Sequence, residues 1–313
     1  MRIVHSFWSK PMLDNEGIYL SNLSYGSWVN KQMFYYTYVL SALLVNKYYP
    51  GKTTLVTDKF GKKLLIDMLK LPYDEVIVEL DYLNNYPKQF WALGKIYAYS
   101  LFNEPFIHLD YDFLLSKPFN QAFENADLVA YMNENDKNRQ RPYKKCVDQY
   151  FVNYTIPQPV EHYIKNYQNI AYNAGVFGGN KVQIFKELWA NCKEIIDLNL
   201  DKIIADASQN TSSFTMTNVI LEQYLFACMA KDRNLEVACL HQNENLLPDE
   251  SNFWLSENNL PKYKAQYYPK QYIHMVGHHK ASIDNAIDIE RILSEVAPEY
   301  ISLISNLFVK KLI

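Results

Sequence analysis

The sequence predicts an α/β fold in which a central, mostly parallel sheet is flanked by helices. The first observation is alternation, because short β-branched and apolar runs take turns with longer helical patterns through the first half of the chain. The second is length, since 313 residues suit one large α/β domain. The third is composition, because 49% hydrophobic and 21% charged residues are typical of a globular chain with a sizeable core.

Strand and helix signals follow one another at short intervals in the first half. Apolar or β-branched runs predict strands over residues 2–5, 53–57, 75–80 and 106–109. Helices are expected over 31–48, where Pro50 and Gly51 stop the pattern, and over 59–70 and 87–101. Such helical crossovers imply parallel strands, and ligands of parallel sheets bind beyond the carboxyl ends of the strands. We therefore expect functional side chains just after Val4, Val56, Val78 and Leu109.

The second half is less regular. Strands are expected over 127–132, 170–177, 236–240 and 272–276, and helices over 182–198 and 214–231. The polar segment 133–145 is expected to be an exposed loop. From Ile283 onward the pattern is helical and is interrupted at Pro298. Without repeats or a clear linker, residues 1–280 are interpreted as one domain and residues 281–313 as a helical tail.

Composition excludes several classes of protein. A formal charge of −3 argues against a nucleic-acid partner. Four cysteines without CxxC spacing suit a reducing compartment, and the N-terminus lacks the apolar core of a signal peptide. We therefore expect a cytoplasmic protein, with a peripheral contact at the inner face of the membrane left open. The 15% aromatic content suits stacking on sugars, although a general compositional habit would look the same.

Asp110 and Asp112 are the most informative pair of residues. They interrupt an apolar run, and burying two close carboxylates is costly unless a cation neutralises them. Ligation by oxygen favours Mg²⁺ or Mn²⁺, which also prefer phosphate oxygens. The alternative is a pair of loop aspartates that cap the next turn.

Two further segments carry candidate site residues. Asn173 precedes Gly175 in a strand that ends in two more glycines, and its amide can both donate to and accept from sugar hydroxyls. His274, Gly277 and Lys280 follow a late strand, where an imidazole suits a transition ion and an amine suits a phosphate. A tight turn and a solvated polar turn are the alternative interpretations of these segments.

Taken in order, these motifs resemble those of the glycogenin-like and lipopolysaccharide-galactosyltransferase-like enzymes. That family carries a D-x-D, an N-[SA]-G-[VM] strand and a terminal H-x-x-G-x-x-K, and the matching residues lie between positions 110 and 280. The resemblance implies the GT-A (Rossmann-like) nucleotide-diphospho-sugar transferase fold and a metal-dependent glycosyltransferase. It implies Mn²⁺ (or Mg²⁺) held by Asp110, Asp112 and His274, with Gly277 and Lys280 on the donor diphosphate.

The same resemblance suggests roles for further residues. Lys95 matches a family lysine that approaches the donor, and Gly175 and Asp110 are likewise expected to contact the donor. Asn173 and Glu222 are expected to position the donor sugar or the acceptor hydroxyl, because Glu222-Gln223 stands where the family has an Asp-Gln pair. The chain departs from the family in its first strand and after Lys280, where Pro-Trp is absent. His5, Phe7, Trp8 and Asp58, which stand at the ends of the first two strands, are expected to hold the nucleoside, with an aromatic ring against the base.

The resemblance implies a nucleotide-sugar donor, with a uridine diphosphate sugar expected, and a saccharide or glycolipid acceptor. It favours retention of anomeric configuration, whereas an inverting enzyme needs a carboxylate base, for which Glu222 could serve. The rival hypotheses are a phosphatase-like hydrolase with Asp110 as nucleophile and a non-catalytic sugar-binding protein of the same fold. The C-terminal tail is expected to pack on the domain, with lipid contact as the alternative.

Overall fold

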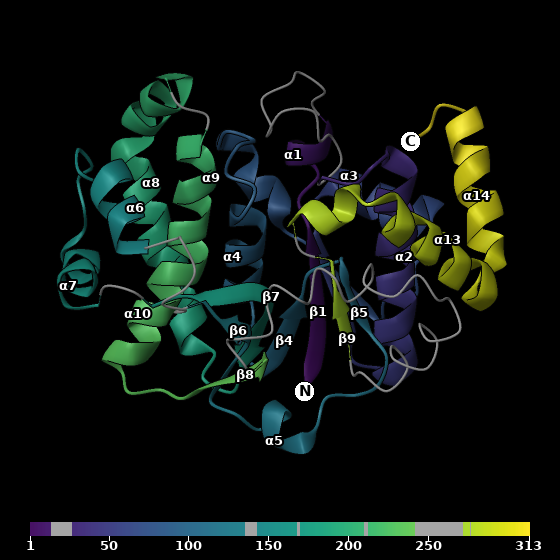
Figure 1. Cartoon of the computed structure of the whole chain (residues 1–313), viewed down its shortest axis with the longest axis horizontal. Coiled ribbons are helices and arrows are strands. Elements are labelled where there is room, and N and C mark those ends of the chain that lie inside the picture. The colour runs from purple at the N-terminus through teal and green to yellow at the C-terminus, as the bar shows by residue number, and fades with distance from the viewer. Residues whose placement is uncertain (14–26, 135–142, 168–169, 210–211, 242–271, 276) are drawn as a thin grey trace.

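A seven-stranded sheet forms the centre of the molecule (Figure 1). The computed structural model describes residues 1–13, 27–134, 143–167, 170–209, 212–241, 272–275 and 277–313. The strand order is β3-β2-β1-β4-β7-β6-β8. The strands are β1 (Arg2–Phe7), β2 (Thr53–Thr57), β3 (Glu75–Val78), β4 (Phe106–Leu109), β6 (Leu128–Asn133), β7 (Tyr172–Gly179) and β8 (Val237–His241). A separate pair joins β5 (Phe113–Leu115) to β9 (Tyr272–His274).

The predicted α/β class with a mostly parallel sheet is confirmed, and one strand runs the other way. In the seven-stranded sheet β7 is antiparallel to both of its neighbours, β4 and β6, while the other four pairs of this sheet are parallel. β4 and β6 therefore end at the edge where β7 begins. In consequence Leu109, Asn133 and Tyr172, which are far apart in the chain, lie at the same edge of the sheet.

Helices cover both faces of the sheet (Figure 1). Adjacent residues Leu55 and Val56 on β2 enter different hydrophobic clusters, because successive side chains of a strand point to opposite faces. One face packs on α4 (Leu93–Ser100), α6 (Tyr143–Tyr150), α7 (Gln158–Asn166), α8 (Gln183–Gln209), α9 (Ser212–Val219) and α10 (Leu225–Asp232). The other packs on α2 (Lys31–Tyr48), α13 (Ile283–Val296) and α14 (Pro298–Val309).

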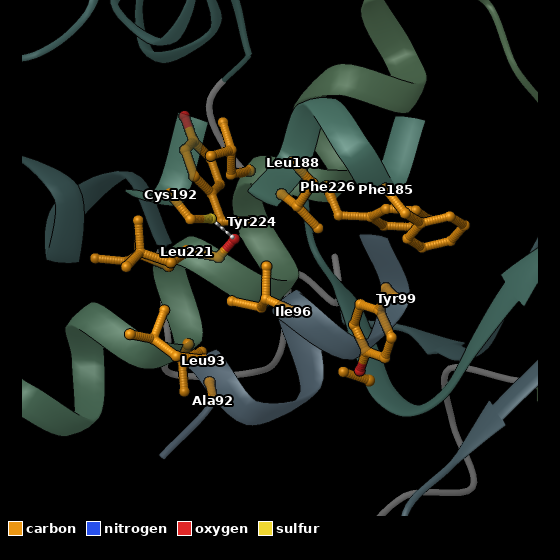
Figure 2. Close-up of a cluster of buried hydrophobic side chains, with 14 of the residues drawn as sticks. Ala92, Leu93, Ile96, Tyr99, Phe185, Leu188, Cys192, Leu221, Tyr224 and Phe226 are labelled. Atoms are coloured by element: carbon orange, nitrogen blue, oxygen red, sulfur yellow. Dashed lines mark hydrogen bonds between the residues drawn. The ribbon is translucent and has the colours of Figure 1, made fainter. Parts of the chain in front are cut away.

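Figure 2 shows part of the first cluster, where aromatic and aliphatic side chains of α4, α8 and α10 meet. Tyr99 of α4 lies fully buried, with its ring centroid 5.7 Å from that of Phe185 and 6.1 Å from that of Phe177. Phe226 packs on Phe177 at 4.4 Å between ring centroids. These contacts fix the phenol of Tyr99, which has a polar partner described below.

The predicted bounds of 31–48, 53–57 and 106–109 agree with α2, β2 and β4. The segment 87–101 is shorter than expected, because α4 begins only at Leu93 and residues 87–92 form turns. Two expected helices contain π-helical turns. The segment 59–70 divides into α3 (Lys59–Lys62) and η1 (Lys63–Met68), and η3 (Ile220–Tyr224) separates α9 from α10. Short helices complete the chain: α1 (Lys10–Leu13), η2 (Leu80–Asn85), α5 (Gln121–Glu124) and η5 (Gly277–Ala281).

The C-terminal helices pack on the rest of the chain. Ile289 and Leu293 of α13 and Ile304 of α14 are fully buried in the cluster that contains α2. Pro298 begins α14, as the sequence predicts for this helix break. Among the described residues no single helix is long and apolar enough to span a membrane, and α13 and α14 pass such a test only as a pair bent by 116°.

Candidate metal centre and its surroundings

Asp110, Asp112 and His274 come together at the carboxyl end of β4. One ligand atom from each lies within 4.8 Å of the other two. Asp110 directly follows β4, and Asp112 directly precedes β5. β9 brings His274 opposite Phe113, and the backbone N–H of Met275 donates to the carbonyl of Asp112 at 3.1 Å. The two-stranded β5–β9 pair is therefore the element that joins the distant histidine to the two aspartates.

The free atoms of this group suit a metal ion. The side chains of Asp112 and His274 are each 4% exposed. Within the described part of the chain, Asp112 Oδ1 and His274 Nδ1 are buried without a hydrogen-bond partner. His274 Nε2 lies 3.4 Å from Asp112 Oδ1, close enough for electrostatic attraction when the imidazole is charged. Buried polar atoms of this kind are costly unless something pairs with them, and a bound cation would do so.

Lys280 completes one side of the centre. Its Nζ lies 2.5 Å from Asp112 Oδ2 and 5.3 Å from the ring centroid of Tyr111. Burial alone would raise the pKa of Asp112, but Lys280 and His274 hold it well below its usual range. Burial likewise opposes the charge on Lys280, and Asp112 outweighs it and raises the pKa of the amine. The Asp112 carboxylate and the Lys280 ammonium are therefore both ionised at neutral pH.

Lys95 connects Asp110 to the buried Glu222. Lys95 Nζ is 3.1 Å from Asp110 Oδ1 and 3.0 Å from Glu222 Oε1. The hydroxyl of Tyr99 donates to the same Glu222 oxygen at 2.9 Å. Burial raises the pKa of Glu222 to about 7, and it also opposes the charge on Lys95, whose pKa is nevertheless raised by Asp110 and Glu222.

The position of Glu222 corrects the expectation that it contacts a substrate. Its side chain is completely buried, and one of its oxygens is bonded to both Lys95 and Tyr99. In this arrangement Glu222 acts through Lys95, which it holds against Asp110. The next residue along η3, Gln223, is instead partly exposed.

Asn173 and Gly175 line the centre from β7. Asn173 Oδ1 accepts from the N–H of Gly175 at 2.9 Å, and the carbonyl of Gly175 accepts from the N–H of Asp110 at 3.0 Å. A Cβ on Gly175 would lie 2.0 Å from Cε1 of His274. The missing side chain therefore makes room for the imidazole, whereas the sequence suggested room for the donor.

The four residues assigned to the nucleoside serve the core in the described structure. His5 is 1% exposed, with Nδ1 2.6 Å from the hydroxyl of Tyr73. Phe7 packs edge-on against Tyr38 at 5.7 Å between centroids, and Trp8 is 5% exposed. Asp58 caps α3 by accepting from the N–H of Gly61, and its other oxygen accepts from the N–H and hydroxyl of Ser9. His5 and Phe7 lie on the same buried face of β1, Trp8 follows this strand, and Asp58 follows β2 as the N-cap of α3.

The burial of His5 predicts acid sensitivity of the fold. Burial lowers the pKa of His5 from 6.5 to about 3. Between these two pH values the imidazole is therefore protonated in the unfolded chain and neutral in the folded chain. The contribution to stability is complete above pH 6.5 and is lost as the pH falls toward 3. Between pH 7 and pH 5 the unfolding free energy should fall by about 2 kcal/mol on this account.

Urea unfolding of the wild type and of His5→Gln at both pH values measures this difference. The variant loses the imidazole hydrogen bonds and should be less stable at pH 7. The difference in unfolding free energy between the wild type and the variant should be smaller at pH 5. The wild type loses stability between pH 7 and pH 5 through His5, whereas the amide of the variant does not titrate. An equal disadvantage at the two pH values would contradict the assignment.

Gly277 begins η5, two residues after Met275. Acceptor contacts are expected from 133–159 and 241–270; the structure describes the first range except for 135–142, whereas the second lies outside the described residues except for its first residue. Tyr99 was not selected from the sequence, and Glu134 entered only as one residue of the range 133–159 expected to contact an acceptor. Glu134 directly follows β6, so the rule that ligands bind beyond strand ends applies to it as it does to Asp110.

A family model described as "Family of unknown function (DUF6734)" matches residues 1–307. No curated protein matches the sequence. A structure of an active-site mutant of LgtC is 12% identical and aligns with a TM-score of 0.47, covering 94% of this chain and 96% of that one. The galactosyltransferase LgtC in complex with donor and acceptor sugar analogues is 13% identical with a TM-score of 0.44, over 98% of this chain and 96% of that chain.

Proposed function

Since the chain belongs to the DUF6734 family, whose description assigns no activity, we propose from the site itself that it is a metal-dependent glycosyltransferase of the GT-A type. It transfers a sugar from a nucleoside diphosphate sugar to a hydroxyl acceptor. The observation that carries this proposal is the group of Asp110, Asp112 and His274, flanked by the ammonium groups of Lys95 and Lys280. The order of the same residues in the three sequence motifs supports it.

The chemistry of the residues suits a leaving diphosphate. Mn²⁺ or Mg²⁺ held by the two aspartates and the histidine would neutralise negative charge on the diphosphate oxygens. Lys280, fixed 2.5 Å from Asp112, offers a second positive charge beside the same oxygens. Lys95 is held in place by Asp110 and Glu222, so its ammonium is already oriented before a ligand binds.

We propose a uridine diphosphate sugar as donor and retention of configuration. Retention is favoured because the carboxylate suggested as a base for inversion, Glu222, is fully buried and bonded to Lys95. A saccharide or glycolipid remains the proposed acceptor.

Calorimetry with UDP and GDP, with and without Mn²⁺, tests the proposal. We expect UDP binding to strengthen at least about tenfold when Mn²⁺ is present, because a cation held by the carboxylates would attract the phosphate oxygens. Hydrolysis of UDP-glucose or UDP-galactose in the presence of Mn²⁺ should accompany it. Absence of nucleotide binding, or a clear preference for GDP, would contradict the proposal, and binding without turnover would support the non-catalytic alternative.

Lys280 separates metal binding from nucleotide binding. Its ammonium competes with any cation for the Asp112 oxygens, so Lys280→Met should bind Mn²⁺ alone about tenfold more tightly. The same variant should bind UDP more weakly in saturating Mn²⁺, because a positive charge beside the diphosphate is lost. Titration with Mn²⁺ and then with UDP measures both effects, and Lys165→Met, on the exposed side of α7, is the matched control. Weaker binding of Mn²⁺ alone by Lys280→Met would contradict the prediction.

A further inference from the structure

A second polar cluster lies beside the metal centre and is formed by Glu134, Asn173, Tyr143 and Gln223. Asn173 Nδ2 donates to Glu134 Oε1 at 2.9 Å, and the hydroxyl of Tyr143 bonds to Glu134 Oε2. The same hydroxyl lies 3.0 Å from Gln223 Oε1. β7 and α6 each supply one hydrogen-bond partner of the Glu134 carboxylate at the end of β6, and η3 joins the cluster through the Tyr143 hydroxyl.

The cluster is attached to the metal centre through β7. Asn173 and Gly175 lie on the same face of this strand, and Gly175 is the residue against which the His274 ring packs. Two residues of a strand span about 7 Å. Asn173, which bonds to Glu134, is therefore about 7 Å along β7 from Gly175, which packs against the ligand His274, and both residues lie at the same edge of the sheet.

η3 connects the cluster to the metal centre a second time. Glu222 and Gln223 are consecutive residues of this π-helical turn, yet Glu222 bonds to Lys95 while Gln223 bonds to Tyr143. π-Helical turns are rare and often occur at functional sites. Here the turn fixes the distance between the Lys95–Asp110 pair and the Glu134 cluster.

The exposure of the four residues fits a binding surface. Tyr143 is 3% and Asn173 is 7% exposed, whereas Glu134 and Gln223 are partly exposed. The buried pair thus orients the two partly exposed side chains. A carboxylate accepts hydrogen bonds and an amide both donates and accepts, which matches the hydroxyl groups of a sugar ring.

We propose that Glu134, positioned by Tyr143 and Asn173, binds hydroxyl groups of the sugar carried by the nucleotide donor. The inference rests on the proposed function, since it assumes that the diphosphate lies at Asp110 and Asp112. A sugar attached to a diphosphate held there would extend along this edge of the sheet, where β7 places Asn173 about 7 Å from Gly175.

The test compares UDP with three UDP-sugars, UDP-glucose, UDP-galactose and UDP-N-acetylglucosamine, in saturating Mn²⁺. In the wild type we expect at least one UDP-sugar to bind more tightly than UDP. In Glu134→Gln the affinity for that UDP-sugar should fall roughly tenfold or more, because hydrogen bonds to a charged group are lost, while the affinity for UDP stays unchanged. Glu161→Gln, which alters an exposed carboxylate of α7, is the matched control and should change neither affinity.

Tyr143→Phe is the second variant, because it removes one donor to Glu134 and keeps the ring in place. It should weaken UDP-sugar binding less than Glu134→Gln and leave UDP binding unchanged. If the cluster served only to tie α6 to the sheet, both variants would lower the thermal midpoint and leave the UDP-sugar preference intact. That outcome would overturn the inference, as would a wild type that binds UDP but gains nothing from the sugar. Failure of the wild type to bind UDP at all would instead refute the proposed function.

Discussion

Asp110→Asn should abolish turnover of a nucleotide sugar, with a loss of about a thousandfold or more, while the chain remains folded. The substitution preserves shape and removes the charge that a divalent cation needs. Lys95 keeps Glu222 as a partner at 3.0 Å, so no buried ammonium is left unpaired. Asp127→Asn, in a partly exposed pair with Lys181, is the matched control and should retain full activity.

Asp112→Asn should be equally inactive and also less stable. Its carboxylate is the partner of the buried Lys280, and breaking a buried pair typically costs about 3–5 kcal/mol. The double variant Asp112→Asn/Lys280→Met should recover most of that stability and none of the activity. Turnover in Mn²⁺, together with urea unfolding, measures the two quantities separately. Wild-type turnover in either aspartate variant, or full activity in excess chelator, would contradict the metal centre.

Gly175→Ala should also weaken metal binding strongly, although glycine has no side chain that could bind the ion. The added Cβ would lie 2.0 Å from Cε1, 2.6 Å from Nδ1 and 2.7 Å from Nε2 of His274. The ring cannot yield easily, because Tyr131 packs edge-on against it at 4.6 Å between centroids. We expect the imidazole to be displaced, Mn²⁺ affinity to fall at least about tenfold, and stability to fall by about 1–3 kcal/mol.

A double-mutant cycle isolates the cause of this effect. Gly175→Ala/His274→Ala should be more stable than Gly175→Ala alone, because the clash disappears with the ring. Its Mn²⁺ affinity should stay low, since the imidazole ligand is absent. If Gly175→Ala binds Mn²⁺ as the wild type does, the assignment of the glycine to His274 is wrong. If the double variant gains no stability, the clash arises elsewhere.

Local patterns accounted for most of the helices and strands. The bounds of α2, β2 and β4 followed from residues within each segment, because hydrophobic period, β-branching and the stop at Pro50 and Gly51 act over a few positions. The polarity of Asp110 and Asp112 within an apolar run likewise indicated a site, since buried carboxylates need a partner. His274 was placed with them by the order of the motifs, and the β5–β9 pair explains how the chain achieves it.

Features that depend on contacts between distant segments were wrong or absent in the sequence analysis. His5, Phe7, Trp8 and Asp58 follow one another or a strand as site residues often do, yet packing directs them into the core. Glu222 and Gln223 differ by one position in η3, and the packing of this helix places Glu222, and not Gln223, against Lys95. Glu134 bonds to Tyr143, nine residues away, and to Asn173, 39 residues away, and these contacts depend on how α6 and β7 pack beside the end of β6.

By itself the sequence determined the α/β class and the order of most elements and indicated Asp110 and Asp112 as candidate metal ligands, because these depend on short-range periodicity and on side-chain chemistry, while His274 was joined to them by the resemblance of the motifs to a known family. The tertiary structure alone decided the direction of β7, the reason for the glycine at position 175 and the orientation of each polar side chain. Those properties arise where segments far apart in the chain fill one volume, and the exclusion of one side chain by another is set by that packing.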